Sequence, residues 1–324
     1  MNIDEIIRLN LWPSSKKTTT QKGLDELENL GFKLFYIGKN ADLYTVNENE
    51  PKILLVRSDR TSVFDIPLNL EIENKGVVQT KISNFGANFA KDFGIDVAIL
   101  DQSVDSSLKV APRTQFMKLC KPLEATIDGE VVQFELIFRN YLTGSLYDAC
   151  QNNLDPYGLN LPSNLKQWHK FETPIFTPTT KGVKDIPLNS EVVRKTFPQI
   201  IESLEKLFKE FTKYAFACGI VVVDTKFEVF VDENGKWLLG DEILTPESSR
   251  FIALEDFEKN SFTSMDKQIL RDFGKEQNWK EKAKDLKTGE KLEVVVPQEI
   301  KDKILNGYNT ILERLSKGKK WEQL

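Results

Sequence analysis

The first third of the chain alternates short apolar blocks with turn-forming residues, and this pattern predicts strands. Between residues 32 and 57, the stretches FKLFYIG, DLYTV and KILLVR are typical of three strands, the last two separated by an Asn-Glu-Asn-Glu-Pro turn. From Gly76 to Phe93 apolar residues recur at helical spacing, and Gly94 ends the predicted helix. Residues 115–141 then predict two strands around an Asp-Gly hairpin turn.

The remaining pattern predicts a mixed region followed by helices. Residues 151–190 are rich in Pro, Asn and Thr and indicate a loop, whereas residues 191–218 predict one long amphipathic helix. Strands are expected at 220–231 and 236–244. The highly charged tail, 255–324, has apolar residues at helical spacing, which predicts further helices.

The order of these elements predicts an α+β protein in two parts. A β-rich N-terminal lobe is expected for residues 1–122, opening with a short helix and a polar tail at residues 1–22. An α+β lobe with extra C-terminal helices is expected for residues 123–324.

Composition then narrows the class of protein. The 324 residues are 40% hydrophobic and 29% charged, which is ordinary for a globular chain. The net charge of −5 provides no global basic field for nucleic acid, and no apolar run approaches the roughly 20 residues of a membrane span. No signal peptide is recognisable, and three cysteines without a CxxC pair suit a reducing compartment. We therefore expect a cytoplasmic protein without a nucleic-acid or membrane partner.

The single histidine, His169, excludes multi-histidine metal sites. Three common nucleotide-binding signatures are also absent: the P-loop, the G-x-G-x-x-G fingerprint and the His-Arg-Asp loop of protein kinases. Any nucleotide site must therefore be built from other residues.

The segment IVVVDTKFEVFV (220–231) carries the strongest chemical pattern. Asp224, Lys226 and Glu228 alternate with apolar residues, so the three side chains share one face of a strand. The Asn-Gly pair that follows is a favoured two-residue hairpin turn. Such a turn would place Glu228 directly opposite Asp241 on the returning strand.

Two directly opposed carboxylates repel each other, so a proton or a cation is expected between Glu228 and Asp241. Oxygen ligands without histidine or thiolate favour magnesium or manganese over zinc. Magnesium held by one or two carboxylates usually completes its shell with water and nucleotide phosphates. The alternative is a hairpin tip at which solvent screens the two acids.

Four further segments combine cations with hydroxyl groups or glycine. YIGKNADLY (36–44) suits a hairpin that covers phosphates, or an ordinary turn. RSDRTSVFD (57–65) could bind an anionic or polyol substrate, or form a salt-bridged loop. FRNYLTGS (138–145) and TPESSR (245–250) each place hydroxyl groups near an arginine, which suits a phosphomonoester.

Taken in order, these motifs resemble the phosphoribosylaminoimidazole-succinocarboxamide synthase (SAICAR synthetase) family. The resemblance runs from about Tyr36 to Arg250 and is most specific in VD-x-K-x-E and GDE-x-x-TP-x-x-SR. It implies a two-lobed fold with a kinase-like small lobe, an ATP-grasp-like large lobe and ATP between them. It also implies the ATP-dependent ligation of L-aspartate to carboxyaminoimidazole ribonucleotide (CAIR), with Mg²⁺ as cofactor.

The resemblance further implies roles for particular residues. Lys39 would lie under the phosphate-covering hairpin, Glu135 would lie near the adenine, and Lys181 and Lys226 would contact the ATP phosphates. Glu228 and Asp241 would hold magnesium, in agreement with the hairpin reasoning. The residues expected to bind CAIR are Asp65, Arg139, Ser145, Asp224, Ser249 and Arg250, and those expected to act in catalysis are Lys226 and Asp224.

Two other functions compete with the ligase: a small-molecule kinase that stops at phosphoryl transfer, and a nucleotide-binding regulatory module. The intact Lys226, Glu228 and Asp241 argue against a module without activity. One departure concerns Lys184-Asp185, where the family often has His-Asp, and it leaves the role of that loop open. The expected partners are the small molecules CAIR, L-aspartate and ATP, and the expected state is a monomer or homodimer.

Overall fold

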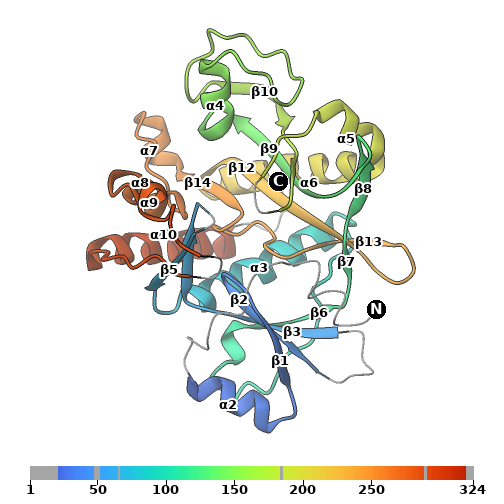
Figure 1. The fold of residues 1–324 in the computed structure, drawn as a ribbon, viewed down its shortest axis with the longest axis vertical. Helices are drawn as coiled ribbons and strands as arrows, with labels where there is room; N and C mark the ends of the chain where they lie inside the picture. The colour runs from blue at the N-terminus through green and yellow to red at the C-terminus, as the bar shows by residue number, and fades with distance from the viewer. Residues whose placement is uncertain (1–20, 47–51, 65, 183–184, 288–289, 319–324) are drawn as a thin grey trace.

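The fold is described from a computed structural model, which covers residues 21–46, 52–64, 66–182, 185–287 and 290–318. The short helix and polar tail expected at residues 1–22 fall almost entirely outside this part, as do Asp65 and Lys184. The described chain is a mixed α+β structure with two main sheets (Figure 1), which confirms the predicted fold class.

The smaller sheet is an antiparallel meander in the order β1-β2-β3-β6. Its first three strands are those predicted between residues 32 and 57, because each is a short β-prone block bounded by turn residues. A two-stranded ribbon, β4-β5, follows. The bounds are α2 (Gln21–Asn29), β1 (Lys33–Ile37), β2 (Ala41–Thr45), β3 (Lys52–Arg57), β4 (Arg60–Val63), β5 (Ile66–Glu71), the 3₁₀ helix η1 (Ala111–Arg113) and β6 (Thr114–Lys118).

The larger sheet has eight strands, with β10-β9-β12-β13 as its main path. The strands β8 and β11 also pair with β9, and β7 and β14 also pair with β12. The hairpin predicted at Asp128-Gly129 joins β8 to β9, with both turn residues at positive φ. The bounds are β7 (Lys121–Pro122), β8 (Glu124–Ile127), β9 (Glu130–Tyr141), β10 (Lys170–Phe176), β11 (Thr179–Thr180), β12 (Ile220–Val231), β13 (Trp237–Gly240) and β14 (Ser249–Ala253).

Figure 1 shows α3 lying between the two sheets and the last helices gathered along one side of the molecule. The helix predicted from Gly76 is confirmed as α3, and the expected C-terminal helices are present. The helix bounds are α3 (Lys75–Asp92), α4 (Gly144–Gln151), α5 (Ser190–Thr196), α6 (Pro198–Ala217), α7 (Leu254–Glu258), α8 (Gln268–Glu276), α9 (Trp279–Lys282) and α10 (Gln298–Lys317).

Three predicted elements differ from the structure. The helix expected at 191–218 is two helices, because Pro198 lacks an N–H and its ring pushes Phe197 out of helical geometry (φ −130°, ψ 56°). The expected loop, 151–190, contains β10 and β11, whose pairing partner β9 is distant in sequence. The strand expected at 236–244 ends at Gly240, because Asp241 turns away with φ 55°.

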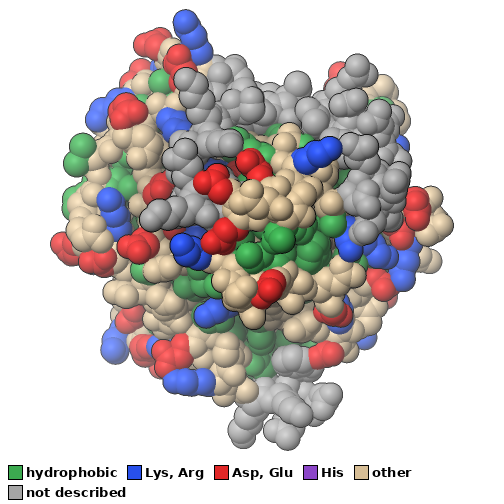
Figure 2. Space-filling view, turned by 90° about the horizontal axis from the view of Figure 1, so that it is seen from below, with side chains coloured by type: hydrophobic (Ala, Val, Ile, Leu, Met, Phe, Trp, Pro, Cys, Tyr) green, Lys and Arg blue, Asp and Glu red, His purple; other side chains and the backbone are tan. Residues whose placement is uncertain are grey.

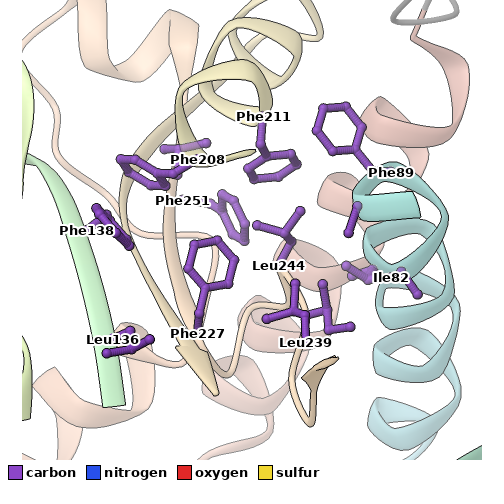
Figure 3. Close-up of a cluster of buried hydrophobic side chains, with 14 of the residues drawn as sticks. Ile82, Phe89, Leu136, Phe138, Phe208, Phe211, Phe227, Leu239, Leu244 and Phe251 are labelled. Carbon is purple, nitrogen blue, oxygen red and sulfur yellow. The ribbon is translucent and has the colours of Figure 1, made fainter. Parts of the chain in front are cut away.

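The main hydrophobic core fills the space between the larger sheet and the helices α3 and α6 (Figure 3). Apolar side chains from both sheets and from α10 belong to this one cluster. Those drawn in Figure 3 include Ile82, Phe89, Leu136, Phe138, Phe208, Phe211, Phe227, Leu239, Leu244 and Phe251. The division into lobes at residue 122 stays a prediction, since the core is continuous across that position.

The surface carries charges of both signs. On the face in Figure 2, acidic and basic side chains are interspersed and neither sign dominates, in keeping with the small net charge of −5. Within the described residues, no helix has the length and apolar character needed to cross a membrane.

Candidate active site

The hairpin of β12 and β13 brings the predicted metal ligands to one region, but with a different register. Glu228 lies opposite Gly240, and Val231 lies opposite Trp237. The expected pairing of Glu228 with Asp241 is therefore wrong by one residue.

A third loop residue causes this shift. The amide of Asp232 donates to the carbonyl of Lys236 at 2.9 Å, so the loop contains three residues and not two. The carboxylate of Asp232 also accepts from the amides of Asn234 (2.9 Å) and Lys236 (3.0 Å). Gly235 closes the loop at φ 79°, a conformation that glycine adopts without strain. This arrangement is the three-residue hairpin with a left-handed glycine.

Asp241 nevertheless lies in the electrostatic environment of Glu228. It follows β13 directly, and its carbonyl accepts a bond from Arg57 at 3.4 Å. Burial, and then the negative charge of Glu228, raise the pKa of Asp241 to about 7. The two acids thus repel each other as the sequence predicted, although they are not cross-strand partners.

Two lysines supply positive charge beside Glu228. The ammonium of Lys226 lies 3.0 Å from Glu228 and 2.5 Å from Glu135, and that of Lys181 donates to Glu228 as well. Burial alone would raise the pKa of Glu228, but the two ammonium groups outweigh it and hold this pKa well below its ordinary value. Burial likewise opposes the charge on Lys226, yet Glu228 and Glu135 raise its pKa well above the usual range. We call Glu135, Lys181, Lys226, Glu228 and Asp241 the nucleotide cluster, after the role that the sequence predicts for them.

A second cluster lies two residues along the same face of β12. The carboxylate of Asp224 is held between two guanidinium groups: Arg139 donates to it at 2.6 Å, and Arg250 donates through Nε at 2.9 and 3.0 Å. The Asp224 side chain is only 9% exposed. Burial would raise its pKa, but Arg250 and Arg139 outweigh burial and lower it. We call these three residues the arginine cluster.

The N-terminus of α4 adjoins the arginine cluster. A Cβ placed on Gly144, the first residue of α4, would lie 3.0 Å from Nη1 of Arg250. Ser145 follows with an exposed side chain, and Thr143 caps no amide with its own side chain. The guanidinium of Arg250 thus lies beside the start of α4, and helix amides, a hydroxyl and a guanidinium are the kinds of donor that bind phosphate groups. Ser249 is not brought there, because its hydroxyl bonds to that of Thr225 at 3.1 Å, on the other face.

The turn between β1 and β2 carries Lys39, which is half-buried. The guanidinium of Arg60 holds this turn by donating to the carbonyl of Gly38 at 2.9 Å and to the carboxylate of Asp42 at 2.5 Å. Tyr36, on β1 before the turn, lies near the nucleotide cluster: burial raises its pKa to about 12, and the charges of Lys181 and Asp241 also act on it. The small sheet therefore borders this cluster through Tyr36. The sequence analysis did not assign Tyr36 to the site.

The segment RSDRTS joins the end of β3 to β4, and its charged side chains form ion pairs within the fold, Arg60 with Asp42 and Asp59 with Arg113. Its two expected interpretations both stay predictions. Arg57 bonds to Gln115 at 2.6 Å and Ser83 at 3.1 Å, and the carboxylate of Asp59 accepts from the amide of Gly76 at 2.9 Å, near the start of α3. Asp65, expected to contact CAIR, lies outside the described residues.

The sequence assigned no role to a further buried acid, Glu247, in the TPESSR segment. Its partners include Lys75, Lys267 and Tyr308, which come from three distant parts of the chain. Tyr308 belongs to the apolar stripe of the last helix and would be taken for a packing residue, so only the tertiary structure could find this group.

Comparison with known proteins identifies the family. The SAICAR synthetase family profile matches residues 34–286, which is most of the chain. The chain belongs to the SAICAR synthetase family. This confirms the resemblance seen in the motifs, and it does not favour a small-molecule kinase.

Individual SAICAR synthetases match most of the length of this chain. The phosphoribosylaminoimidazole-succinocarboxamide synthase of Histophilus somni is 32% identical over 304 residues, covering 90% of this chain and 100% of the relative. The SAICAR synthase of Saccharomyces cerevisiae, solved with SAICAR, is 26% identical, with a TM-score of 0.71 over 94% of this chain and 99% of its own. A type-2 SAICAR synthetase solved with ADP has the same fold at 18% identity, with a TM-score of 0.60 over 88% of this chain and 99% of its own.

Proposed function

We propose that this chain ligates L-aspartate to the carboxylate of CAIR, consuming ATP and producing SAICAR, ADP and phosphate in de novo purine biosynthesis. The observation that carries the proposal is the pair of charged clusters on one face of β12, two residues apart. The nucleotide cluster balances acids against lysines, and the arginine cluster offers two guanidinium groups to an anion. The match to a synthase of this name, over 90% of this chain and all of the relative, supports the same reaction.

The reaction needs activation because a carboxylate resists attack by an amine. A carboxylate oxygen of CAIR attacks the γ-phosphorus of ATP, the bond to the bridging oxygen breaks, and ADP leaves. The resulting acyl phosphate is attacked at its carbonyl carbon by the amine of aspartate. The amine loses a proton, phosphate departs with the bonding pair, and an amide remains. Positioning and charge neutralisation supply most of the catalysis in such a phosphoryl transfer.

The nucleotide cluster is the proposed ATP site. Lys181 and Lys226 carry the charges that a triphosphate requires, Glu135 orients Lys226, and Lys39 lies in the turn proposed to cover the phosphates. Lys226 is the residue we propose to act on the transferred phosphoryl group.

The same cluster suits a magnesium ion. Within the described residues no group of three or more His, Cys, Asp or Glu side chains is arranged as a metal site, so the protein would contribute two carboxylates, Glu228 and Asp241. This donor set fits Mg²⁺, which uses one or two carboxylates and completes its shell with water and phosphate oxygens. Burial and then repulsion by Glu228 raise the pKa of Asp241, and such a cation would relieve the repulsion. When bound, the ion would neutralise charge on the ATP phosphates.

The arginine cluster is the proposed CAIR site. Arg139, Arg250 and Ser145 would hold the ribonucleotide phosphate beside the N-terminus of α4. Asp224 positions both guanidinium groups and would contact the sugar or base. We expect Asp65 to contribute as well, and we expect the enzyme to act in the cytoplasm as a monomer or homodimer.

The test uses purified protein with ATP, Mg²⁺ and CAIR, with and without L-aspartate. SAICAR should form only when aspartate is present, and Lys226→Met should reduce the rate by at least about 100-fold because it removes charge stabilisation from the phosphoryl transfer. Lys206→Met, which changes an exposed lysine on α6, is the matched control and should retain the rate. ADP release that never requires CAIR would contradict the proposal, and a phosphorylated CAIR that is never converted with aspartate would favour the kinase.

A further inference from the structure

A buried carboxylate lies on the β13–β14 loop, residues 241–248, which joins the two clusters. The Glu247 side chain is only 4% exposed. Its neighbour Ser248 accepts a backbone bond from the amide of Lys226 at 2.8 Å, and Arg250 follows three residues after Glu247. The conformation of this loop therefore sets the placement of groups in both clusters.

Four elements converge on the two oxygens of Glu247. Oε1 accepts from the hydroxyl of Tyr308 at 2.7 Å and from the ammonium of Lys75 at 3.2 Å. Oε2 lies 2.8 Å from the ammonium of Lys267 and accepts from the side-chain amide of Asn40 at 3.3 Å. Asn40 comes from the β1–β2 turn, Lys75 from the start of α3, Lys267 from the residue before α8, and Tyr308 from α10. These four donors offset the large desolvation cost that a buried carboxylate otherwise carries.

Tyr308 brings the C-terminal helix into this network. It is 1% exposed, and the preceding residue, Gly307, allows α10 to approach the chain closely: a Cβ there would lie 2.4 Å from the carbonyl oxygen of Met265. Burial, and then the charge of Glu247, raise the pKa of Tyr308 well above its ordinary value, so the hydroxyl stays a donor. The helix α10 lies beyond residue 286, where the match to the family profile ends.

We propose that Tyr308 is a positioning residue: through its bond to Glu247, α10 fixes the β13–β14 loop in the conformation that aligns Lys226 and Arg250. This inference rests on the proposed function for the identity of the substrates. A hydrogen bond from a hydroxyl to a buried carboxylate is charge-assisted and therefore stronger than a neutral one. Its loss leaves an oxygen of Glu247 with one donor fewer on a loop that carries substrate-binding groups.

The test compares Tyr308→Phe with Tyr214→Phe. Each change removes one buried tyrosine hydroxyl. The hydroxyl of Tyr308 links α10 to Glu247, whereas that of Tyr214, on α6, donates to the carbonyl of Leu315 near the C-terminal end of α10, at 2.6 Å. We expect Tyr308→Phe to raise KM for CAIR by about tenfold while kcat falls less than about threefold. Tyr214→Phe should leave both constants within about twofold of wild type. A second readout is amide hydrogen exchange, which should accelerate across residues 241–248 in Tyr308→Phe and not in Tyr214→Phe.

Each outcome decides the inference. If both variants change KM and loop exchange equally, Tyr308 only packs and the inference is wrong. If Tyr308→Phe does not fold, Glu247→Gln is tested in its place, because this change keeps the shape of the side chain and weakens the bond to Tyr308. An unchanged KM for CAIR and unchanged loop exchange in Glu247→Gln would then overturn the inference. Failure of the wild-type protein to make SAICAR would instead contradict the proposed function, and the exchange experiment would still test the coupling of α10 to the loop.

Discussion

Replacing Asp241 with asparagine should stabilise the metal-free protein at alkaline pH while removing its Mg²⁺-dependent activity. Burial, followed by the charge of Glu228, raises the pKa of Asp241 from its ordinary value of 3.8 to about 7. A carboxyl group with a higher pKa in the folded state favours folding when it is protonated. Its contribution is complete below the unfolded pKa of 3.8 and is lost as the pH rises through 7.

The size of the effect follows from the shift. A change of one in pKa corresponds to about 1.4 kcal/mol, so the full shift corresponds to about 4 kcal/mol. Asp241 is half-buried, and screening by solvent reduces this value. We therefore expect Asp241→Asn to raise the free energy of unfolding by about 1–3 kcal/mol at pH 8. The difference should shrink at pH 5, where the wild-type carboxyl is also neutral.

The assay is urea unfolding with EDTA at pH 8 and pH 5. Asp101→Asn is the control, because it makes the same substitution at an acid whose side chain is 84% exposed. We expect it to change the free energy of unfolding by less than about 0.5 kcal/mol. Adding Mg²⁺ with ATP should then stabilise the wild type more than Asp241→Asn, and SAICAR formation should fall sharply in the variant. An Asp241→Asn protein less stable than wild type at pH 8 would refute the electrostatic reasoning, and near-normal turnover would refute the metal role.

Two further substitutions test the neighbouring groups. Asp224→Asn should lower the free energy of unfolding by about 3–5 kcal/mol at pH 7, because two buried guanidinium groups lose their counter-charge. Urea unfolding measures this loss, with Asp101→Asn as the control, and a loss below about 1 kcal/mol would contradict the buried ion pair. Because the folded state lowers the pKa of Asp224, the stabilisation that its carboxylate gives to the folded state should be present above about pH 4 and fade as the pH falls further. Arg60→Lys should raise KM for ATP by about three- to tenfold, since an ammonium cannot hold both Asp42 and the Gly38 carbonyl in the fork geometry. An unchanged KM for ATP would show that the β1–β2 turn does not take part in nucleotide binding.

Elements with a local cause were predictable from the sequence. The strand 220–231 and the helix α3 have strong apolar periodicity, and the Asp-Gly turn between β8 and β9 carries its own conformational preference. The family motifs pointed to the region around β12 for a similar reason, because alternation along a single strand decides which side chains share a face. Asp224, Lys226 and Glu228 needed no knowledge of the rest of the fold to be placed together.

Elements with a distant cause were not predictable. Strand β10 exists because β9 pairs with it, and its own sequence, KFETPIF, contains a proline at a shift in register. Glu247 is ionised in the interior because four groups from distant segments surround it. No pattern near Glu247 or Tyr308 records these contacts.

At the hairpin, the predicted repulsion between Glu228 and Asp241 is present although the predicted register is wrong. The Asn-Gly pair predicts a two-residue turn, but the carboxylate of Asp232 binds two loop amides and favours three residues, which shifts the register by one. The charge of Glu228 still acts on Asp241, which follows β13 in a left-handed conformation. The predicted need for a cation is met by Lys226 and Lys181, the latter from the expected loop. Binding of a divalent cation would therefore exchange one cation for another at Glu228, and would free the ammonium of Lys181 for the nucleotide phosphates that we propose it binds.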